Sequence, residues 1–120
     1  MIGSEAEGRA WVAEHADDPA RMLDQLDRFI DALTEENSRQ NLVSAKSLGS
    51  MWQRHIADSA QLALHVPRET NLADLGSGAG LPGVVLGILR PQSNVTLIEV
   101  RPRRVEWLNR VVDQLGLGNV

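Results

Sequence analysis

A run of glycines in the middle of the chain has the clearest chemical meaning. Residues 74–83 read Asp-Leu-Gly-Ser-Gly-Ala-Gly-Leu-Pro-Gly. Glycines at every second position let a ligand approach bare backbone, where any side chain would collide, and they permit positive φ angles. The string Gly78-x-Gly80-x-x-Gly83 matches the pattern that places a dinucleotide pyrophosphate at a helix N-terminus. By itself that match is weak, because a second class of ligand uses such a loop.

Two carboxylates near the loop distinguish the ligand classes. Asp74 stands two residues before the first glycine, where it would repel a pyrophosphate but can hold an ammonium group. S-adenosylmethionine carries an ammonium and no phosphate. Glu99, 23 residues after Gly76, can accept both ribose hydroxyls of an adenosine in either class. The pair favours S-adenosylmethionine; the alternative is that Asp74 caps a turn which the glycines merely form.

The elements around the loop predict an α/β fold. An apolar run over 71–75 predicts a strand, and Pro82 predicts the first turn of the following helix. Residues 94–100 predict a second, buried strand, and 102–115 predict a helix that Gly116 closes. A strand, helix, strand order implies a parallel pair.

The first part of the chain, residues 1–70, predicts a helical region. Ser4 and Glu7 have capping-box spacing before a helix that ends near His15, and Asp18 with Pro19 begins an amphipathic second helix. A third helix is expected from a cap at Ser47 or Ser50 to about His65.

Composition narrows the class of protein. The chain has 120 residues, 12 Lys+Arg against 16 Asp+Glu, a net charge of −4 and no cysteine. One compact unit is expected, and disulfides, thiolate zinc sites and thiol nucleophiles are excluded. No apolar run approaches the ~20 residues that cross a bilayer, so we expect a cytoplasmic protein without a membrane partner. Residues 1–36 carry a net charge of −7 and 37–120 carry +3, so a polyanion would meet the second part first.

Beyond the glycine loop, three further motifs carry a resemblance to a known family. They are Asn41-Leu42, Arg54-His-Ile-Ala-Asp-Ser59 and Arg103-Arg-Val-Glu-Trp-Leu108. Together with residues 74–83 they resemble the small-subunit ribosomal RNA methyltransferase G family, also called glucose-inhibited division protein B. The resemblance covers the chain from about residue 20 to its end.

The resemblance implies a Rossmann-like methyltransferase fold, of which 71–120 would supply the first strand-helix-strand-helix portion. It implies S-adenosylmethionine-dependent methylation of a guanosine N7 in 16S ribosomal RNA, with that RNA or the small ribosomal subunit as partner and a monomeric parent protein. The chain stops where the third strand of such a sheet should begin, so an N-terminal part of a longer protein is expected. The cofactor-binding residues would be Asp74, Gly76, Ser77, Gly78, Gly80, Leu81 and Glu99.

Residues on the substrate side follow partly from the same resemblance. Arg54, His55, Asp58, Arg103 and Arg104 are the candidates for contact with the target base or with phosphate. Without it, the spacing of four between Arg54 and Asp58 indicates a surface pair on a helix. No metal site is expected, because the histidines lack ligand spacing.

No catalytic base is expected, because guanine N7 bears no proton. The tryptophans at helical apolar positions predict core packing more than base stacking. Two other functions stay open: an enzyme that binds a nicotinamide or flavin dinucleotide, and a nucleotide- or RNA-binding module without catalysis.

Overall fold

The computed structural model describes residues 2–120. In chain order its elements are α1 (Glu5–His15), α2 (Pro19–Glu36), a 3₁₀ helix η1 (Ala45–Ser50), a π-helical segment η2 (Met51–Ile56), α3 (Ala57–Ala63), β1 (Asn71–Leu75), α4 (Gly83–Leu89), β2 (Asn94–Ile98) and α5 (Pro102–Leu115). The prediction of a mixed helix and strand chain, helical before residue 71, is confirmed.

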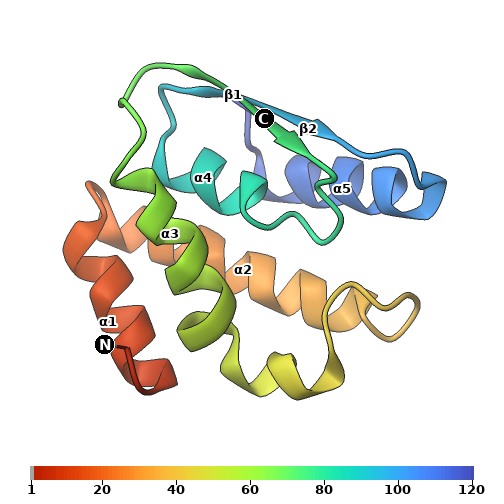
Figure 1. Ribbon diagram of the computed structural model, residues 1–120, viewed down its shortest axis with the longest axis horizontal. Helices are drawn as coiled ribbons and strands as arrows, with labels where there is room; N and C mark the ends of the chain where they lie inside the picture. Colours follow the sequence, from red (N-terminus) through yellow and green to blue (C-terminus); the bar gives the residue numbers. More distant parts are fainter. Residues whose placement is uncertain (1) are drawn as a thin grey trace.

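The two strands form a parallel sheet with helices on one side. They pair in register from Asn71 opposite Asn94 to Leu75 opposite Ile98, as the strand, helix, strand order predicts. Helices α4 and α5 lie under the sheet in Figure 1, and α1, α2 and α3 lie beyond them. Both α2 and α3 contact α4, so the N-terminal helices pack on the layer that supports the sheet.

The first two helices begin where their caps predict. The Ser4 side chain accepts a hydrogen bond from the backbone N–H of Glu7, and the Asp18 side chain accepts one from that of Arg21. These bonds satisfy N–H groups that have no partner within the first turn. At the other end of the chain, Gly116 closes α5 with a left-handed φ of 65°.

The expected single helix from Ser47 or Ser50 to His65 is wrong in detail. The segment begins as the 3₁₀ helix η1, capped by the side chain of Ser44, continues as the π-helical η2, and becomes a regular helix only from Ala57 to Ala63. Glu5 of α1 explains the change, because its carboxylate accepts hydrogen bonds from the backbone N–H groups of Trp52 (3.1 Å) and Gln53 (2.6 Å). A distant side chain therefore caps this segment, and local spacing does not reveal it.

Buried side chains from both parts of the chain form one hydrophobic cluster. It includes Phe29 and Leu33 of α2, Ile56 of η2, Val84 of α4 and Trp107 of α5. Because the helical region and the sheet region share this core, the helices are part of the support for the loop between β1 and α4.

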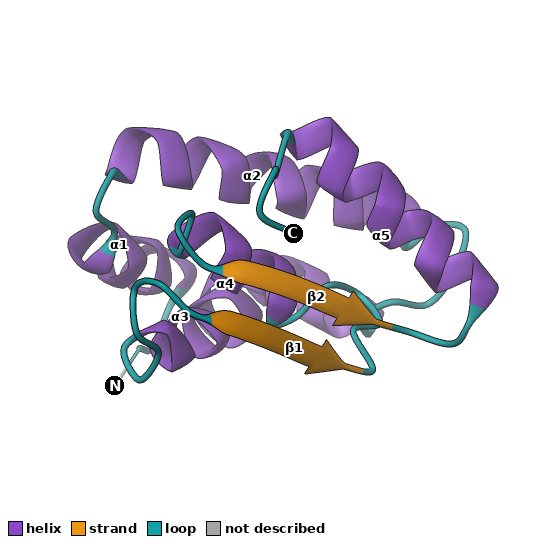
Figure 2. Ribbon diagram, turned by 90° about the horizontal axis from the view of Figure 1, so that it is seen from above, coloured by secondary structure: helices purple, strands orange, loops and turns teal. Residues whose placement is uncertain are grey.

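The outer face of the sheet is open, which corrects the prediction that residues 94–100 form a buried strand. Strand β2 ends at Ile98, and Leu75, Ile98 and Val100 are 77%, 42% and 88% exposed. Figure 2 views the strands from this side, and no helix of residues 2–120 lies in front of them. The backbone N–H of Val95 donates to the carbonyl of Asn119 at 2.8 Å, so the last residues run beside the free edge of β2.

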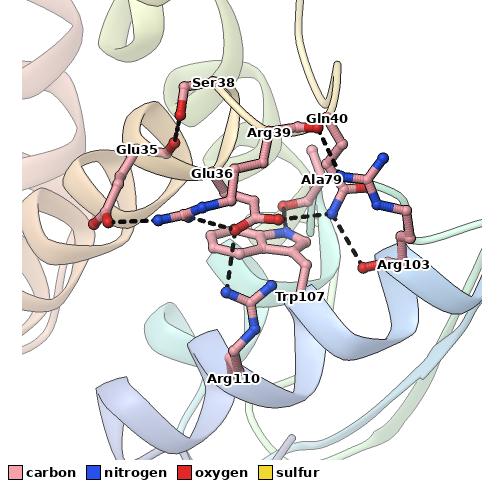
Figure 3. A network of polar contacts seen from close by, with 9 residues as sticks. All are labelled: Glu35, Glu36, Ser38, Arg39, Gln40, Ala79, Arg103, Trp107 and Arg110. Atoms are coloured by element: carbon pink, nitrogen blue, oxygen red, sulfur yellow. Dashed lines mark hydrogen bonds and ion pairs between the residues drawn. The ribbon is translucent and has the colours of Figure 1, made fainter.

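A buried acid joins the end of α2 to α5. The Glu36 side chain is 4% exposed, and its carboxylate accepts hydrogen bonds from Arg39 (3.0 Å), Arg110 (3.1 Å) and Gln40 (2.8 Å), as Figure 3 shows. These donors, Arg110 above all, lower the pKa of Glu36 to about 2, against the opposing effect of burial. The carboxylate is therefore a fixed, charged link between the two helices.

We expect stability to fall with pH as this acid is protonated. The folded pKa of Glu36 lies below the ordinary 4.5, so its contribution is complete above pH 4.5 and is lost as pH falls towards about 2. Glu36→Gln should lower the free energy of unfolding by about 3 kcal/mol at pH 7 and change it little near pH 2. Urea denaturation at the two pH values measures this difference.

The neighbouring acid Glu35 is the matched control. Its side chain is 72% exposed and pairs only with Arg39, so Glu35→Gln should cost less than about 1 kcal/mol at either pH. Equal losses for the two variants would contradict the assignment of the acid sensitivity to Glu36.

Candidate cofactor and substrate site

The glycine loop is held at the ends of the two strands by backbone bonds and one serine. The N–H groups of Gly76 and Ser77 both donate to the Ile98 carbonyl, at 2.7 and 3.1 Å. The Ser77 hydroxyl donates to the Asp74 carbonyl (2.9 Å) and accepts from the Ile98 N–H (3.1 Å). Ser77 is 1% exposed, and its hydroxyl fastens the loop to β2, so contact of Ser77 with a ligand stays a prediction.

Asp74 lies in β1, opposite Leu97 of β2, just before the turn that leads to α4. Its Oδ2 accepts a hydrogen bond from the N–H of Gly83 at 3.1 Å, which is the capping contact that the alternative interpretation of this residue predicts. A Cβ on Gly83 would lie 2.6 Å from that oxygen and would also collide with the Leu97 side chain, so glycine lets the helix start this close to the strands. Burial raises the pKa of Asp74, while the Gly83 N–H opposes the shift. A cation placed beside the carboxylate would relieve this penalty.

Glu99 reaches across from the end of β2 to the same loop. Its Oε1 accepts from the Gly78 N–H at 2.8 Å, and its Oε2 accepts from the N–H groups of Val100 (2.9 Å) and Arg101 (3.0 Å). These backbone donors, Arg101 first, lower the pKa of Glu99, so the side chain is held as an anion. Gly78 has a φ of 51°, and a Cβ there would have only Gly76 O and Glu99 Oε1 within 4 Å, at 3.8 and 3.9 Å. The space that a side chain would fill is therefore open to a ligand beside Glu99.

Trp107 supports the loop from below, and the sequence patterns did not single it out for this role. Its indole N–H donates to the Ala79 carbonyl at 3.0 Å, its side chain is buried, and its ring lies against Phe29 with centroids 6.4 Å apart. Figure 3 shows Ala79 on one side of this indole and the Glu36 carboxylate close by. The prediction of core packing is confirmed for Trp107. Its hydrogen bond to Ala79 gives it a second role, which is to hold the glycine loop. The only signal in the sequence was a tryptophan at an apolar helical position.

A hollow of about 220 Å³ lies on the helical side of the loop. It is lined by Arg54, His55, Asp58, Ser59, Leu62, Leu81 and Pro82. The structure therefore brings three substrate-side candidates together with one cofactor candidate, Leu81. The expected surface pair of Arg54 and Asp58 does not form within 4.0 Å, because η2 has π-helical bonds that change the spacing of side chains around the helix.

The other two substrate-side candidates lie away from this hollow. Arg103 donates to the Arg39 carbonyl (2.6 Å) and Arg104 to the Asn41 carbonyl (3.2 Å), so both side chains bind the segment that follows α2. Arg104 still adds to the field that lowers the pKa of Glu99. Neither arginine lines the hollow beside the loop, so the hollow does not support their assignment to the substrate.

Residues 2–120 contain neither a metal-binding cluster nor a membrane-spanning helix. That part of the chain holds no cluster of three or more His, Asp or Glu able to bind a metal ion. Its helices also include none with the length and apolarity to cross a bilayer.

Comparison with known proteins places the chain in a family. The family model for rRNA small subunit methyltransferase G matches residues 22–120. The chain belongs to the methyltransferase G family. The resemblance inferred from the motifs is therefore confirmed.

Individual relatives in this family agree with the match. A ribosomal RNA small subunit methyltransferase G of Erythrobacter litoralis is 53% identical over 120 residues, 99% of this chain and 57% of its own length. The protein of the same name from Novosphingobium aromaticivorans is 46% identical over 123 residues, 98% of this chain and 52% of its own length. The chain thus spans about half the length of the curated relatives it matches.

Trp107→Phe tests whether the hydrogen bond from the Trp107 indole to the Ala79 carbonyl fixes the shape of the glycine loop in this methyltransferase G chain. The variant keeps an aromatic ring in the core and removes the donor to Ala79, leaving a buried carbonyl without a partner. We expect amide hydrogen exchange at Gly78 and Gly80 to accelerate about tenfold, in line with the loss of one hydrogen bond. Exchange followed by NMR measures the effect residue by residue.

Trp52→Phe is the matched control, since Trp52 is also buried but lies in η2, away from the loop. It should lower global stability without a selective effect at Gly78 and Gly80. A similar exchange pattern in both variants would show that Trp107 acts only through core packing.

Proposed function

We propose that the chain forms the cofactor-binding part of an S-adenosylmethionine-dependent RNA methyltransferase with a Rossmann-like sheet. The observation that supports this most is the meeting of two carboxylates at one bare loop. Asp74 lies near the end of β1 and Glu99 directly follows β2, so both lie at the same end of the parallel pair. Asp74 accepts an N–H from Gly83 and Glu99 accepts one from Gly78, both residues of the glycine loop. Crevices beyond the carboxyl ends of parallel strands are where such folds bind ligands.

The residues fit this cofactor by charge and by space. Asp74 is half-buried and, in the described residues, has no cation within 4.0 Å, so an ammonium group would stabilise its charged form. Glu99 keeps lone pairs beyond its three backbone donors and can accept ribose hydroxyls. The open backbone at Gly76 and Gly78 would face the ligand between them, and Leu81 would line its outer side.

When bound, S-adenosylmethionine supplies a methyl group on a sulfonium sulfur. The proposed acceptor is N7 of a guanosine in 16S ribosomal RNA, presented as free RNA or in the small ribosomal subunit. Transfer would form a bond from the N7 lone pair to the methyl carbon and break the carbon–sulfur bond, and the positive charge would pass from sulfur to the purine. No proton has to leave N7 first, so the chain needs to align the two reactants rather than supply a base. We place this reaction in the cytoplasm and the parent protein as a monomer.

The names of two relatives support the RNA substrate. The relatives from Erythrobacter litoralis and Novosphingobium aromaticivorans are named ribosomal RNA small subunit methyltransferase G. Their extra length would supply the remaining strands of the sheet and the far side of the cofactor pocket. A dinucleotide enzyme is disfavoured, because a pyrophosphate at the start of α4 would meet the Asp74 carboxylate at Gly83.

Calorimetric titration with S-adenosylhomocysteine and with NAD tests the cofactor. We expect binding of the first and none of the second. Asp74→Asn keeps an acceptor for the Gly83 N–H but loses the charge, and should weaken S-adenosylhomocysteine binding about tenfold.

Asp24→Asn, an exposed acid on α2 without a hydrogen-bond partner of its own among the described residues, should leave that affinity unchanged. A preference for NAD, or equal effects of the two substitutions, would reject the proposal.

A further inference from the structure

Two hollows on the helical side of the glycine loop share the side chain of Arg54. The one described above, of about 220 Å³, is called the base hollow from here on. The second, the serine hollow, measures about 120 Å³ and is lined by Ser44, Lys46, Ser47, Ser50 and Arg54. Because Arg54 lines both, the two hollows are neighbours.

The serine hollow has the chemistry of a phosphate site. Lys46 is the only lysine in the chain, and neither it nor Arg54 has a carboxylate within 4.0 Å among residues 2–120. Both cations are exposed, beside three serine side chains. The hydroxyls of Ser44 and Ser47 lie 2.8 Å apart, so they have a fixed relative position. Two cations without carboxylate partners, together with serine side chains in the same hollow, suit the oxygens of a phosphate group.

The base hollow has the chemistry of a site for a purine with two neighbouring donors. Its wall includes the apolar side chains of Leu62, Leu81 and Pro82, with Leu62 48% exposed, and a flat ring can cover them. Asp58 is exposed, pairs with no cation in the described residues, and can only accept hydrogen bonds when charged. Among the bases, guanine alone offers two adjacent donors, N1–H and the N2 amino group, to one carboxylate.

His55, which lines this hollow, also carries a buried ring nitrogen. Nε2 of His55 is enclosed and has no hydrogen-bond partner in the described part of the chain. Buried polar atoms are nearly always paired, and the exceptions mark strained or functional positions. His55 lies in the π-helical segment η2, a type of helix distortion that is frequent at functional sites.

We propose that these hollows bind one guanosine nucleotide of an RNA strand. Its phosphate lies between Lys46 and Arg54, and its ring lies over Leu81 and Pro82. Its N1–H and N2 amino group donate to the Asp58 carboxylate. This reading rests on the proposed function and identifies how the same site selects its acceptor base. Because N7 is on the ring edge opposite N1 and N2, it stays free to face the glycine loop.

Guanosine 5′-monophosphate is the probe, with adenosine and inosine 5′-monophosphates as comparisons. We expect titration of the ¹⁵N-labelled chain to shift amides of 44–50, 54–58 and 81 with guanosine monophosphate. Adenosine monophosphate should bind at least about tenfold more weakly, because it offers no paired donors to Asp58. Inosine monophosphate keeps N1–H but lacks the amino group, so its affinity should lie between the two.

Two variants separate the base contact from the phosphate contact. Asp58→Asn turns an amide towards the guanine donors and should remove the preference for guanosine monophosphate. Lys46→Gln should weaken all three nucleotides and inorganic phosphate alike. Asp24→Asn is the matched control for the acid and should change neither. Short single-stranded RNA with one guanosine, compared with the same strand carrying adenosine, shows whether a strand binds as the free nucleotide does.

Three results would overturn the inference. They are equal affinity for guanosine and adenosine monophosphates, an unchanged preference in Asp58→Asn, and a shift of the 54–58 amides by S-adenosylhomocysteine in place of the nucleotide. Each can occur while S-adenosylhomocysteine still binds in preference to NAD, so failure here differs from failure of the proposed function. Loss of S-adenosylhomocysteine binding with guanosine selectivity retained would reject the cofactor and keep the base site.

Discussion

The loop between β1 and α4 has almost no side chains with which to pack, so hydrogen bonds to its backbone must hold its shape. Four groups supply them: the Ile98 carbonyl, the carboxylates of Asp74 and Glu99, and the indole of Trp107. They come from β1, from the end of β2 and from α5, so the loop takes its form only when those elements are assembled. A bare backbone fixed in this way is what a ligand needs in order to meet a preorganised surface.

The N-terminal helices contribute to that surface from a distance. Phe29 of α2 lies against Trp107, and Glu36 at the end of the same helix pairs with Arg110, one turn further along α5. A shift of α2 would therefore move the indole that supports Ala79. On the helical side of the loop, Glu5 of α1 caps the segment η2, which carries Arg54 and His55. The helical region thus positions both sides of the loop.

Local signals were sufficient to predict much of the fold. The caps at Ser4, Asp18 and Gly116 stand directly at the ends of their helices, so the sequence reveals them. The spacing of the glycines is also a local feature and is equally visible in the sequence. The π-helical segment was not predictable, because Glu5 lies 47 residues before Trp52. The bond from Trp107 to Ala79 spans 28 residues and depends on how α5 packs. The exposure of Ile98 was missed because an apolar residue does not show whether another layer covers it.

The candidate site was also predictable only where its residues are marked by local features of the sequence. Asp74 and Glu99 were found because Asp74 lies near the end of β1 and Glu99 directly follows β2, and the two strands are parallel neighbours. The bond between the Ser77 hydroxyl and the Ile98 N–H was not predictable, since nothing in the sequence around Ser77 shows that its hydroxyl turns back to β2. Lys46 was not singled out, because the serine hollow exists only when η1 folds beside Arg54.

The central claim is that the glycine loop is already shaped to receive S-adenosylmethionine between Asp74 and Glu99. A crystal structure of the chain with S-adenosylhomocysteine tests it most directly. The account predicts the amino group beside Asp74, the ribose hydroxyls on Glu99, and an indole of Trp107 still bound to Ala79. A ligand bound elsewhere, or a loop rebuilt so that Ala79 leaves Trp107, would contradict it.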